Sequence, residues 1–175
     1  MHKNKIRLDE VTLHYGNGCH KPRFNFWNGR GRNGNSAPKN VLEIGTSKGY
    51  TACAIRAAIG EKARFKSLDV AAAGEEFKKR FPTHKDEAVQ ISSMDFDWKR
   101  ESPYDFVYIN GEHKYTALMS DTNNAFETTR KGGIILWHNY RKDPKSKLTF
   151  FIDFLAKFVD IVSIKDTHFA LHRRV

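Results

Sequence analysis

The sequence predicts an α/β fold in which helices cover both faces of a mostly parallel sheet, giving three layers. From Val41 onward, short apolar runs alternate with helix-like stretches, which is the pattern of successive βα units. The chain has 175 residues, of which 39% are hydrophobic and 13% aromatic. This size and composition indicate a globular protein with one core and exclude disordered and fibrous classes.

The order of elements follows from apolar runs and from the residues that interrupt them. Parallel strands are expected at 41–45, 65–70, 88–92, 104–109 and 133–138. Helices are expected at 50–59, 73–81, 114–130 and 146–159, with Pro82 ending the second and Gly132 and Gly133 ending the third. The last two runs, 160–164 and 168–174, predict an antiparallel hairpin around residues 165–167.

Two helices have apolar faces that predict how they pack. In 114–130 one buried stripe is expected, made of Tyr115, Leu118, Met119, Thr122, Ala125, Phe126 and Thr129. In 146–159 the inward face is expected to hold Leu148, Phe151, Ile152, Leu155, Phe158 and Val159. Phe150 and Phe154 fall on the opposite face, where they could join two copies of the chain or lie under the N-terminal segment.

Residues 1–40 are expected to form a loop-rich N-terminal arm outside the sheet, because glycines alternate there with Asn and basic residues. The formal net charge is +10, and residues 21–39 carry five positive charges, no acid, and the aromatics Phe24, Phe26 and Trp27. Such a segment could stack on nucleic-acid bases. Anchoring of the arm to the core is the favoured interpretation, because no defined nucleic-acid motif is present.

Further features of the sequence concern the compartment. There is no apolar run of membrane-spanning length and no secretion signal, so we expect a soluble, cytoplasmic protein that does not contact membranes. Cys19 and Cys53 are the only cysteines and are expected to be reduced thiols.

The segment Glu43-Ile44-Gly45-Thr46-Ser47-Lys48-Gly49 takes an apolar strand through two glycines into a helix. Gly45 would allow a sharp turn and the close approach of a ligand to the backbone. Gly49 would allow the helix to begin close to the sheet. Asp69, twenty residues beyond Gly49, ends the second strand, where a carboxylate can accept hydrogen bonds from ribose hydroxyls. Alternatively, Glu43 is a surface carboxylate and Asp69 a helix N-cap. The spacing matches neither dinucleotide nor P-loop motifs, which leaves S-adenosylmethionine (SAM), a nucleoside without phosphate.

Longer motifs then become recognisable. LEIGTSKGYTA resembles the first motif of class I SAM-dependent methyltransferases, particularly small-molecule O-methyltransferases, and YDFVYINGEHKYTALMSD (104–121) with KGGIILWHNY (131–140) resembles their IDGDH and HDY motifs. The resemblance covers 41–140 and, loosely, the hairpin to 174. It implies a SAM-binding domain over 41–175, with a Rossmann-like seven-stranded sheet of order 3-2-1-4-5-7-6 whose last strand is antiparallel.

The resemblance also implies a site at the carboxyl ends of the strands. The expected cofactor-binding residues are Glu43, Gly45, Thr46, Ser47, Gly49 and Asp69, with Ser92, Ser93 and Asp95 near the adenine. Asn110 and Asn139 follow neighbouring strands and should face one crevice with His113 and His138.

The two asparagines depart from the family pattern, which has Asp at both crevice positions. In metal-dependent relatives those carboxylates hold a divalent cation such as Mg²⁺ or Ca²⁺. Neutral amides bind a hard cation weakly, so we do not expect metal dependence, although Glu112, Asp121 or Asp143 could supply a replacement carboxylate.

The expected chemistry is methyl transfer to oxygen of a small or saccharide-like acceptor, with His113 or His138 as general base and Asn110 and Asn139 orienting the acceptor. Alternatively, His113 is bonded to backbone at a helix start and His138 packs under Trp137. A second hypothesis is a non-catalytic relative that binds RNA or a protein through its basic arm. Methylation of nucleic acid ranks lower, because the Asn/Asp-Pro-Pro-aromatic motif of base-amino methylation is missing.

Overall fold

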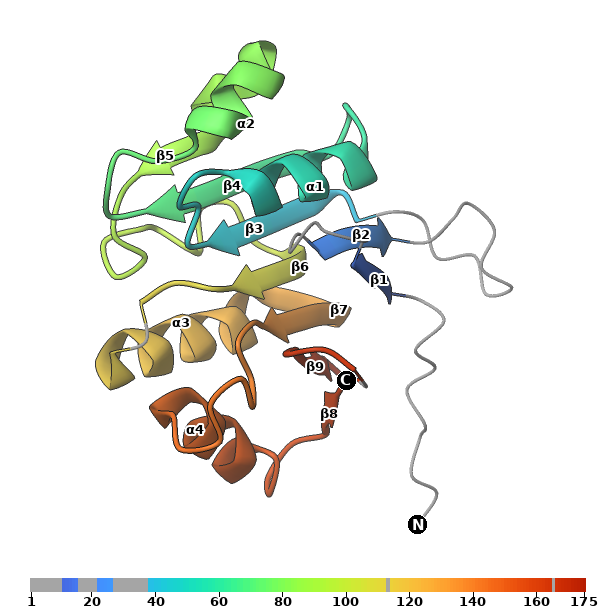
Figure 1. Cartoon of the computed structure of the whole chain (residues 1–175), viewed down its shortest axis with the longest axis vertical. Coiled ribbons are helices and arrows are strands. Elements are labelled where there is room, and N and C mark those ends of the chain that lie inside the picture. The colour runs from blue at the N-terminus through green and yellow to red at the C-terminus, as the bar shows by residue number, and fades with distance from the viewer. Residues whose placement is uncertain (1–10, 16–21, 27–37, 113, 165) are drawn as a thin grey trace.

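A computed structural model describes residues 11–15, 22–26, 38–112, 114–164 and 166–175. Helices cover both faces of a seven-stranded sheet (Figure 1). Its strands are β3 (Asn40–Ile44), β4 (Arg64–Asp69), β5 (Ala88–Gln90), β6 (Tyr104–Ile109), β7 (Thr129–Trp137), β8 (Ile161–Ser163) and β9 (Ala170–Arg173). The α-helices are α1 (Tyr50–Ile59), α2 (Glu75–Arg80), α3 (Tyr115–Thr128) and α4 (Lys147–Leu155), and a 3₁₀ helix, η2, spans Pro82–Glu87.

The strand order is β5-β4-β3-β6-β7-β9-β8. Strands β5, β4, β3, β6 and β7 run parallel, whereas β9 is antiparallel to both β7 and β8. This arrangement confirms the predicted order 3-2-1-4-5-7-6 with its antiparallel last strand. The strand order therefore reverses between β3 and β6. In open α/β sheets ligands bind at the carboxyl ends of the strands at such a point, and this region is called the crevice below.

The core has two layers, one on each face of the sheet. Alternate residues of β3 face α1 or face α3 and α4, so Val41 packs in one layer and Leu42 in the other. All five residues of β3 are buried, as expected for a central strand covered on both sides. Within the described ranges, every helix is too short or too polar to span a lipid bilayer.

Two predicted helix ends are wrong. Helix α3 ends at Thr128 and the chain enters β7 at Thr129, so Gly132 and Gly133 lie within the strand. Glycine suits both positions, because Gly132 has φ of 76° and a Cβ on Gly133 would lie 2.5 Å from Cγ2 of Thr129. Helix α4 ends at Leu155 instead of continuing to 159, so Phe158 leaves the inward face and is 71% exposed.

The buried stripe of α3 also differs from the expected one. Tyr115 and Met119 are exposed, whereas Asp121 and Thr128 are buried. Apolar periodicity misses inward positions that hold polar residues, and this shifts the inferred face around the helix. The exposure predicted for Phe150 and Phe154 is confirmed.

The expectation that residues 1–40 lack regular strands is wrong for 11–15 and 22–26, and Asn40 already belongs to β3. Strands β1 (Val11–Tyr15) and β2 (Pro22–Phe26) pair antiparallel as a separate two-stranded sheet, and β2 lies beside α1 (Figure 1). The glycines that suggested a loop fall between or after these strands. Trp27 lies outside the described residues.

Candidate active site

The glycine loop between β3 and α1 can be built only with glycine at two positions. Gly45 has φ of 93°, and a Cβ there would lie 2.1 Å from the backbone oxygen of Asn110. Its N–H donates to the carbonyl oxygen of Leu68 at 2.8 Å. Gly49 has φ of 88° and immediately precedes α1, where a Cβ would lie 2.9 Å from Cβ of Phe77. The loop thus lies directly against the end of β6 and against α2.

Glu43 lies beneath this loop and is fully buried, so the alternative of a surface carboxylate is wrong. The Ser67 hydroxyl donates to its Oε2, and Ser67 Oγ lies 2.6 Å from Thr46 Oγ1. Among the described residues its Oε1 has no hydrogen-bond partner. Burial, with the negative charge of Asp69, raises the pKa of Glu43 to about 8 against the opposing bond from Ser67. A buried acid with an unsatisfied oxygen favours a cationic or hydrogen-bond-donating ligand.

Asp69 ends β4 and binds the glycine loop. Its Oδ2 accepts the Ser47 N–H at 2.8 Å and its Oδ1 accepts the Ala71 N–H at 3.0 Å. It does not cap α2, whose N-cap residue is Gly74, so the helix-cap alternative is wrong. Each carboxylate oxygen can accept a second hydrogen bond, which leaves acceptor capacity toward a ligand.

The ends of β6 and β7 bring Asn110, His138 and Asn139 together. Asn110 Oδ1 lies 2.8 Å from His138 Nδ1 and accepts the Asn139 side-chain N–H at 3.3 Å. Because a carbonyl oxygen can only accept, the contact with Asn110 Oδ1 requires the proton on Nδ1 of His138. The imidazole ring lies 4.9 Å from the Phe169 ring and 6.1 Å from the Tyr108 ring, so it does not pack under Trp137.

The loop after β5 approaches the same crevice. Ser92 Oγ accepts the Met94 N–H at 3.2 Å, and the Asp95 N–H donates to the Ser92 carbonyl at 3.0 Å. Ser93 donates a side-chain hydrogen bond to Asp121 of α3. The three residues predicted to lie near the adenine are therefore in one compact turn.

Asp121 was expected only as a possible replacement carboxylate, and the sequence did not predict its burial. It is 1% exposed, and its Oδ1 lacks a hydrogen-bond partner in the described part of the chain. Burial raises its pKa to about 6, opposed by the bond from Ser93. A Cβ built on Gly111 would lie 3.6 Å from its Oδ2, which places it beside the end of β6. The feature of the sequence that could have revealed its burial is an acidic residue at an inward position of α3.

The remaining predicted residues do not join the crevice or cannot be placed. His113 lies outside the described residues. Glu112 is exposed and pairs with Lys114 at 2.7 Å, and Asp143 is exposed and accepts the Lys145 N–H at 2.9 Å.

Within the described ranges no three His, Cys, Asp or Glu side chains gather into a metal site. Asn110 and Asn139 offer neutral oxygens, so these crevice donors do not fit a divalent cation.

The sequence matches the model of a known protein family. A family model described as a methyltransferase domain matches residues 42–140, more than half of the chain. The chain belongs to this methyltransferase family. With its sheet order it is a class I SAM-dependent methyltransferase by family and fold, which confirms the resemblance inferred from the motifs. A search of curated proteins finds no match.

Solved structures share the fold at low sequence identity. The SAH-bound methyltransferase PaMTH1 of Podospora anserina is 17% identical with a TM-score of 0.64, over 79% of this chain and 72% of that one. The SAM-bound O-methyltransferase TomG of Streptomyces achromogenes is 16% identical with a TM-score of 0.58, over 79% and 74%. MycE, from the mycinamycin pathway and bound to Mg and SAH, is 18% identical with a TM-score of 0.52, over 77% and 44%.

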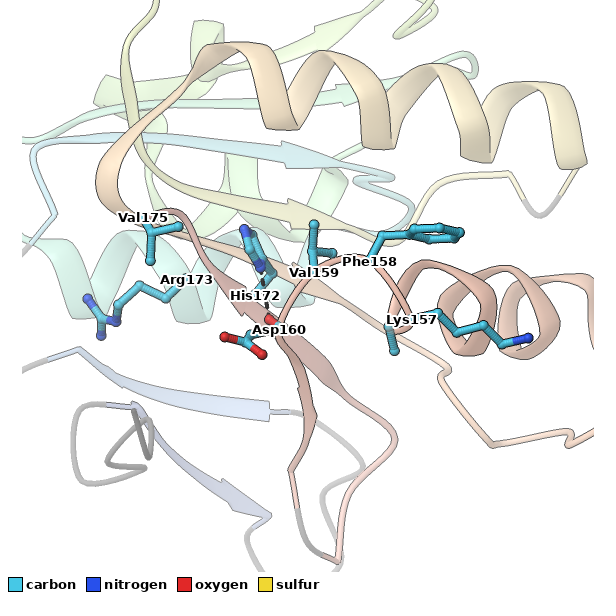
Figure 2. Close-up of a pocket in the computed structure, with 8 residues that line it drawn as sticks. Lys157, Phe158, Val159, Asp160, His172, Arg173 and Val175 are labelled. Atoms are coloured by element: carbon cyan, nitrogen blue, oxygen red, sulfur yellow. Dashed lines mark hydrogen bonds between the residues drawn. The ribbon is translucent and has the colours of Figure 1, made fainter. Parts of the chain in front are cut away.

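A pocket of about 290 Å³ lies elsewhere, between the end of α4 and β9 (Figure 2). Lys157, Asp160, His172 and Arg173 are among the residues that line it. Arg173 pairs with Ile134, whereas the crevice follows Trp137 at the other end of the paired segment. This pocket is therefore separate from the methyltransferase crevice.

Proposed function

We propose that the domain spanning residues 41–175 binds SAM across the carboxyl ends of β3 and β4 and methylates an oxygen of a small or saccharide-like molecule. The observation that carries this proposal is the buried Glu43 with its unsatisfied oxygen, beneath a loop whose backbone is bare at Gly45. SAM is positively charged and needs close approach to backbone, so the residues present fit it.

The proposed contacts follow the chain. Asp69 accepts hydrogen bonds from the ribose hydroxyls with the acceptor capacity that remains on its carboxylate. Glu43 faces the positively charged end of the cofactor, directly or through water. The proposed cofactor-binding residues are Glu43, Gly45, Thr46, Ser47, Gly49, Asp69, Ser92, Ser93 and Asp95.

For the reaction, bound SAM would supply a methyl group on a sulfonium, whose carbon–sulfur electron pair returns to sulfur on transfer. His138 Nε2 accepts the proton of the acceptor hydroxyl as that oxygen bonds to the methyl carbon. Asn110 holds His138 in the required tautomer through the 2.8 Å contact and, with Asn139, orients the acceptor. His113 remains a second proposed base. No step passes through a metal.

A second candidate is a non-catalytic relative that binds RNA or a protein through the arm of residues 1–40. The neutral Asn110 and Asn139, together with the five positive charges of residues 21–39, favour it. Steep loss of RNA affinity with rising salt, together with no formation of S-adenosylhomocysteine (SAH) from SAM, would support it.

Phe150 and Phe154 are proposed as a contact between two copies of the chain. Sedimentation of a Phe150→Ser, Phe154→Ser variant tests this contact.

Calorimetry with SAH tests the main proposal. We expect wild-type protein to bind one SAH, and Asp69→Ala to bind at least about tenfold more weakly, because two charged hydrogen bonds are lost. Asp86→Ala, an exposed acid in η2, serves as the matched control and should bind as wild type. Absence of SAH binding by folded wild-type protein would refute the proposal.

A further inference from the structure

The segment 141–147, called here the 141–147 loop, leads from β7 into the first residue of α4 (Figure 1). It carries basic residues close to Asn139. It begins two residues after Asn139, and the Lys142 N–H donates to the Asn139 carbonyl at 3.2 Å. The loop holds Arg141, Lys142, Lys145 and Lys147 against a single acid, Asp143. Four basic residues therefore lie within eight positions of Asn139 in the sequence.

The loop is held in one arrangement by a buried threonine. Thr149 is 3% exposed; its Oγ1 accepts the Arg141 N–H at 3.0 Å and donates to the Asp143 carbonyl at 2.9 Å. Ser146 caps α4 by accepting the Thr149 N–H at 3.1 Å. The backbone that carries the lysines is therefore fixed relative to Asn139.

Ion pairing does not account for these cations. Arg141 pairs with Asp153 at 3.2 Å, whereas Lys142, Lys145 and Lys147 are exposed and form no ion pair with any described residue. Helix stability does not account for them either, because cations next to the first turn of α4 oppose the helix dipole. The nearby acids are already engaged, Asp143 in its own turn and Glu112 with Lys114.

The cofactor does not account for them, because SAM is itself a cation and would be repelled by a basic crevice wall. Resting on the proposed function, we propose that the methyl acceptor is a small anion, bearing a phosphate or carboxylate that the 141–147 loop binds while its hydroxyl faces His138. The three lysines attract the anion and hold the end of the acceptor remote from the reacting oxygen.

The test uses the full chain saturated with SAH and titrated by calorimetry with inorganic pyrophosphate in one arm and citrate in the other. Wild-type protein should bind one anion per chain, and the arm with the tighter binding identifies phosphate or carboxylate. The variant Lys142→Gln, Lys145→Gln, Lys147→Gln should bind about tenfold more weakly, because three charge contacts are removed.

The control is Lys62→Gln, Lys78→Gln, Lys85→Gln, which removes the same charge from exposed lysines near α1, α2 and η2. It should bind the anion within twofold of wild type, and both variants should bind SAH unchanged. Equal weakening in both variants, or no binding of either anion, would overturn the inference. So would binding of a single-stranded RNA oligonucleotide that needs the loop lysines when neither small anion binds.

A separate calorimetric titration of the wild-type protein with SAH distinguishes the failure of one proposal from the failure of the other. Loss of SAH binding would refute the proposed function, whereas loss of the loop-dependent anion binding alone would refute only the acceptor class.

Discussion

The β3–β4 side of the crevice contains a buried and a half-buried carboxylate, whereas the β6–β7 side contains amides, an imidazole and exposed lysines. Glu43 is fully buried, and the Asp69 carboxylate accepts the Ser47 N–H of the glycine loop. Asn110 and Asn139 are neutral at the two positions where the resembled motifs have Asp, and the next loop is basic. The difference indicates that one side suits a cation and the other an anion, as methyl transfer from SAM to a charged acceptor would require.

The largest effect should come from Gly45→Ala. A Cβ would meet the Asn110 carbonyl oxygen at 2.1 Å and force the loop away from β6, so SAH binding should fall by more than about 100-fold, equivalent to roughly 3 kcal/mol. Gly60→Ala is the matched control, since Gly60 also has positive φ but nothing lies within 4 Å of its Cβ position. Because its backbone (φ 76°, ψ 168°) lies in a region that is essentially restricted to glycine, this variant should lose about 1–3 kcal/mol of stability but bind SAH as wild type does. Equal SAH binding by both variants would show that the glycine loop at Gly45 does not contact the cofactor.

His138→Gln tests the acceptor side alone. Gln can still donate to Asn110 but is not a base near neutral pH, so kcat should fall about 100-fold with the KM for the acceptor and the Kd for SAH nearly unchanged. The measurement is SAH formation with the acceptor that wild-type protein methylates. His84→Gln, which alters a histidine bonded to Glu61 at the far side of α2, should leave kcat unchanged. If kcat survives in His138→Gln, the base is another group, such as His113.

Glu43→Gln should change how both stability and affinity depend on pH. A buried acid whose pKa is raised from 4.5 to about 8 binds more protons folded than unfolded, so stability of the cofactor-free protein falls between these pH values and levels off above. The variant should lose this slope and be more stable than wild type at pH 9. SAM binding favours ionised Glu43, so wild-type affinity should rise toward pH 8, and the variant should bind about tenfold more weakly there.

Thermal unfolding from pH 5 to 9 and SAM calorimetry over the same range measure these two quantities. Asp86→Asn, at an exposed acid of η2, is the control for a lost charge without burial. Parallel stability curves for wild type and Glu43→Gln would contradict the assigned ionisation of Glu43.

The smallest effect is expected from restoring acids on the acceptor side. Asn110→Asp with Asn139→Asp supplies two anionic oxygens, so Mg²⁺ at millimolar concentration should raise the unfolding temperature of the variant by about 2–4 °C and not that of wild type. Each single variant serves as a control and should respond less. A Mg²⁺ response already present in wild type would show that the amides bind a cation.

The sequence predicted the strands and the site loop better than it predicted depth and side-chain partners. Apolar runs and the glycine pair locate β3, α1 and β6 because local pattern decides them. The burial of Glu43 and Asp121 depends on α1, α2 and α3 closing over the sheet, which no local spacing encodes. The end of α3 at Thr128 is likewise decided by pairing of β7 with β6. The β1–β2 hairpin was missed because glycines around it outweighed two short alternating runs.

A crystal structure of the protein with SAH tests the central claim most directly. The account predicts the adenosyl group across the ends of β3 and β4, with ribose hydroxyls on Asp69, adenine beside Ser92 and Ser93, and the amino-acid end above Glu43. SAH bound in another pocket, or protein side chains filling the space above Gly45 at saturating SAH, would contradict it.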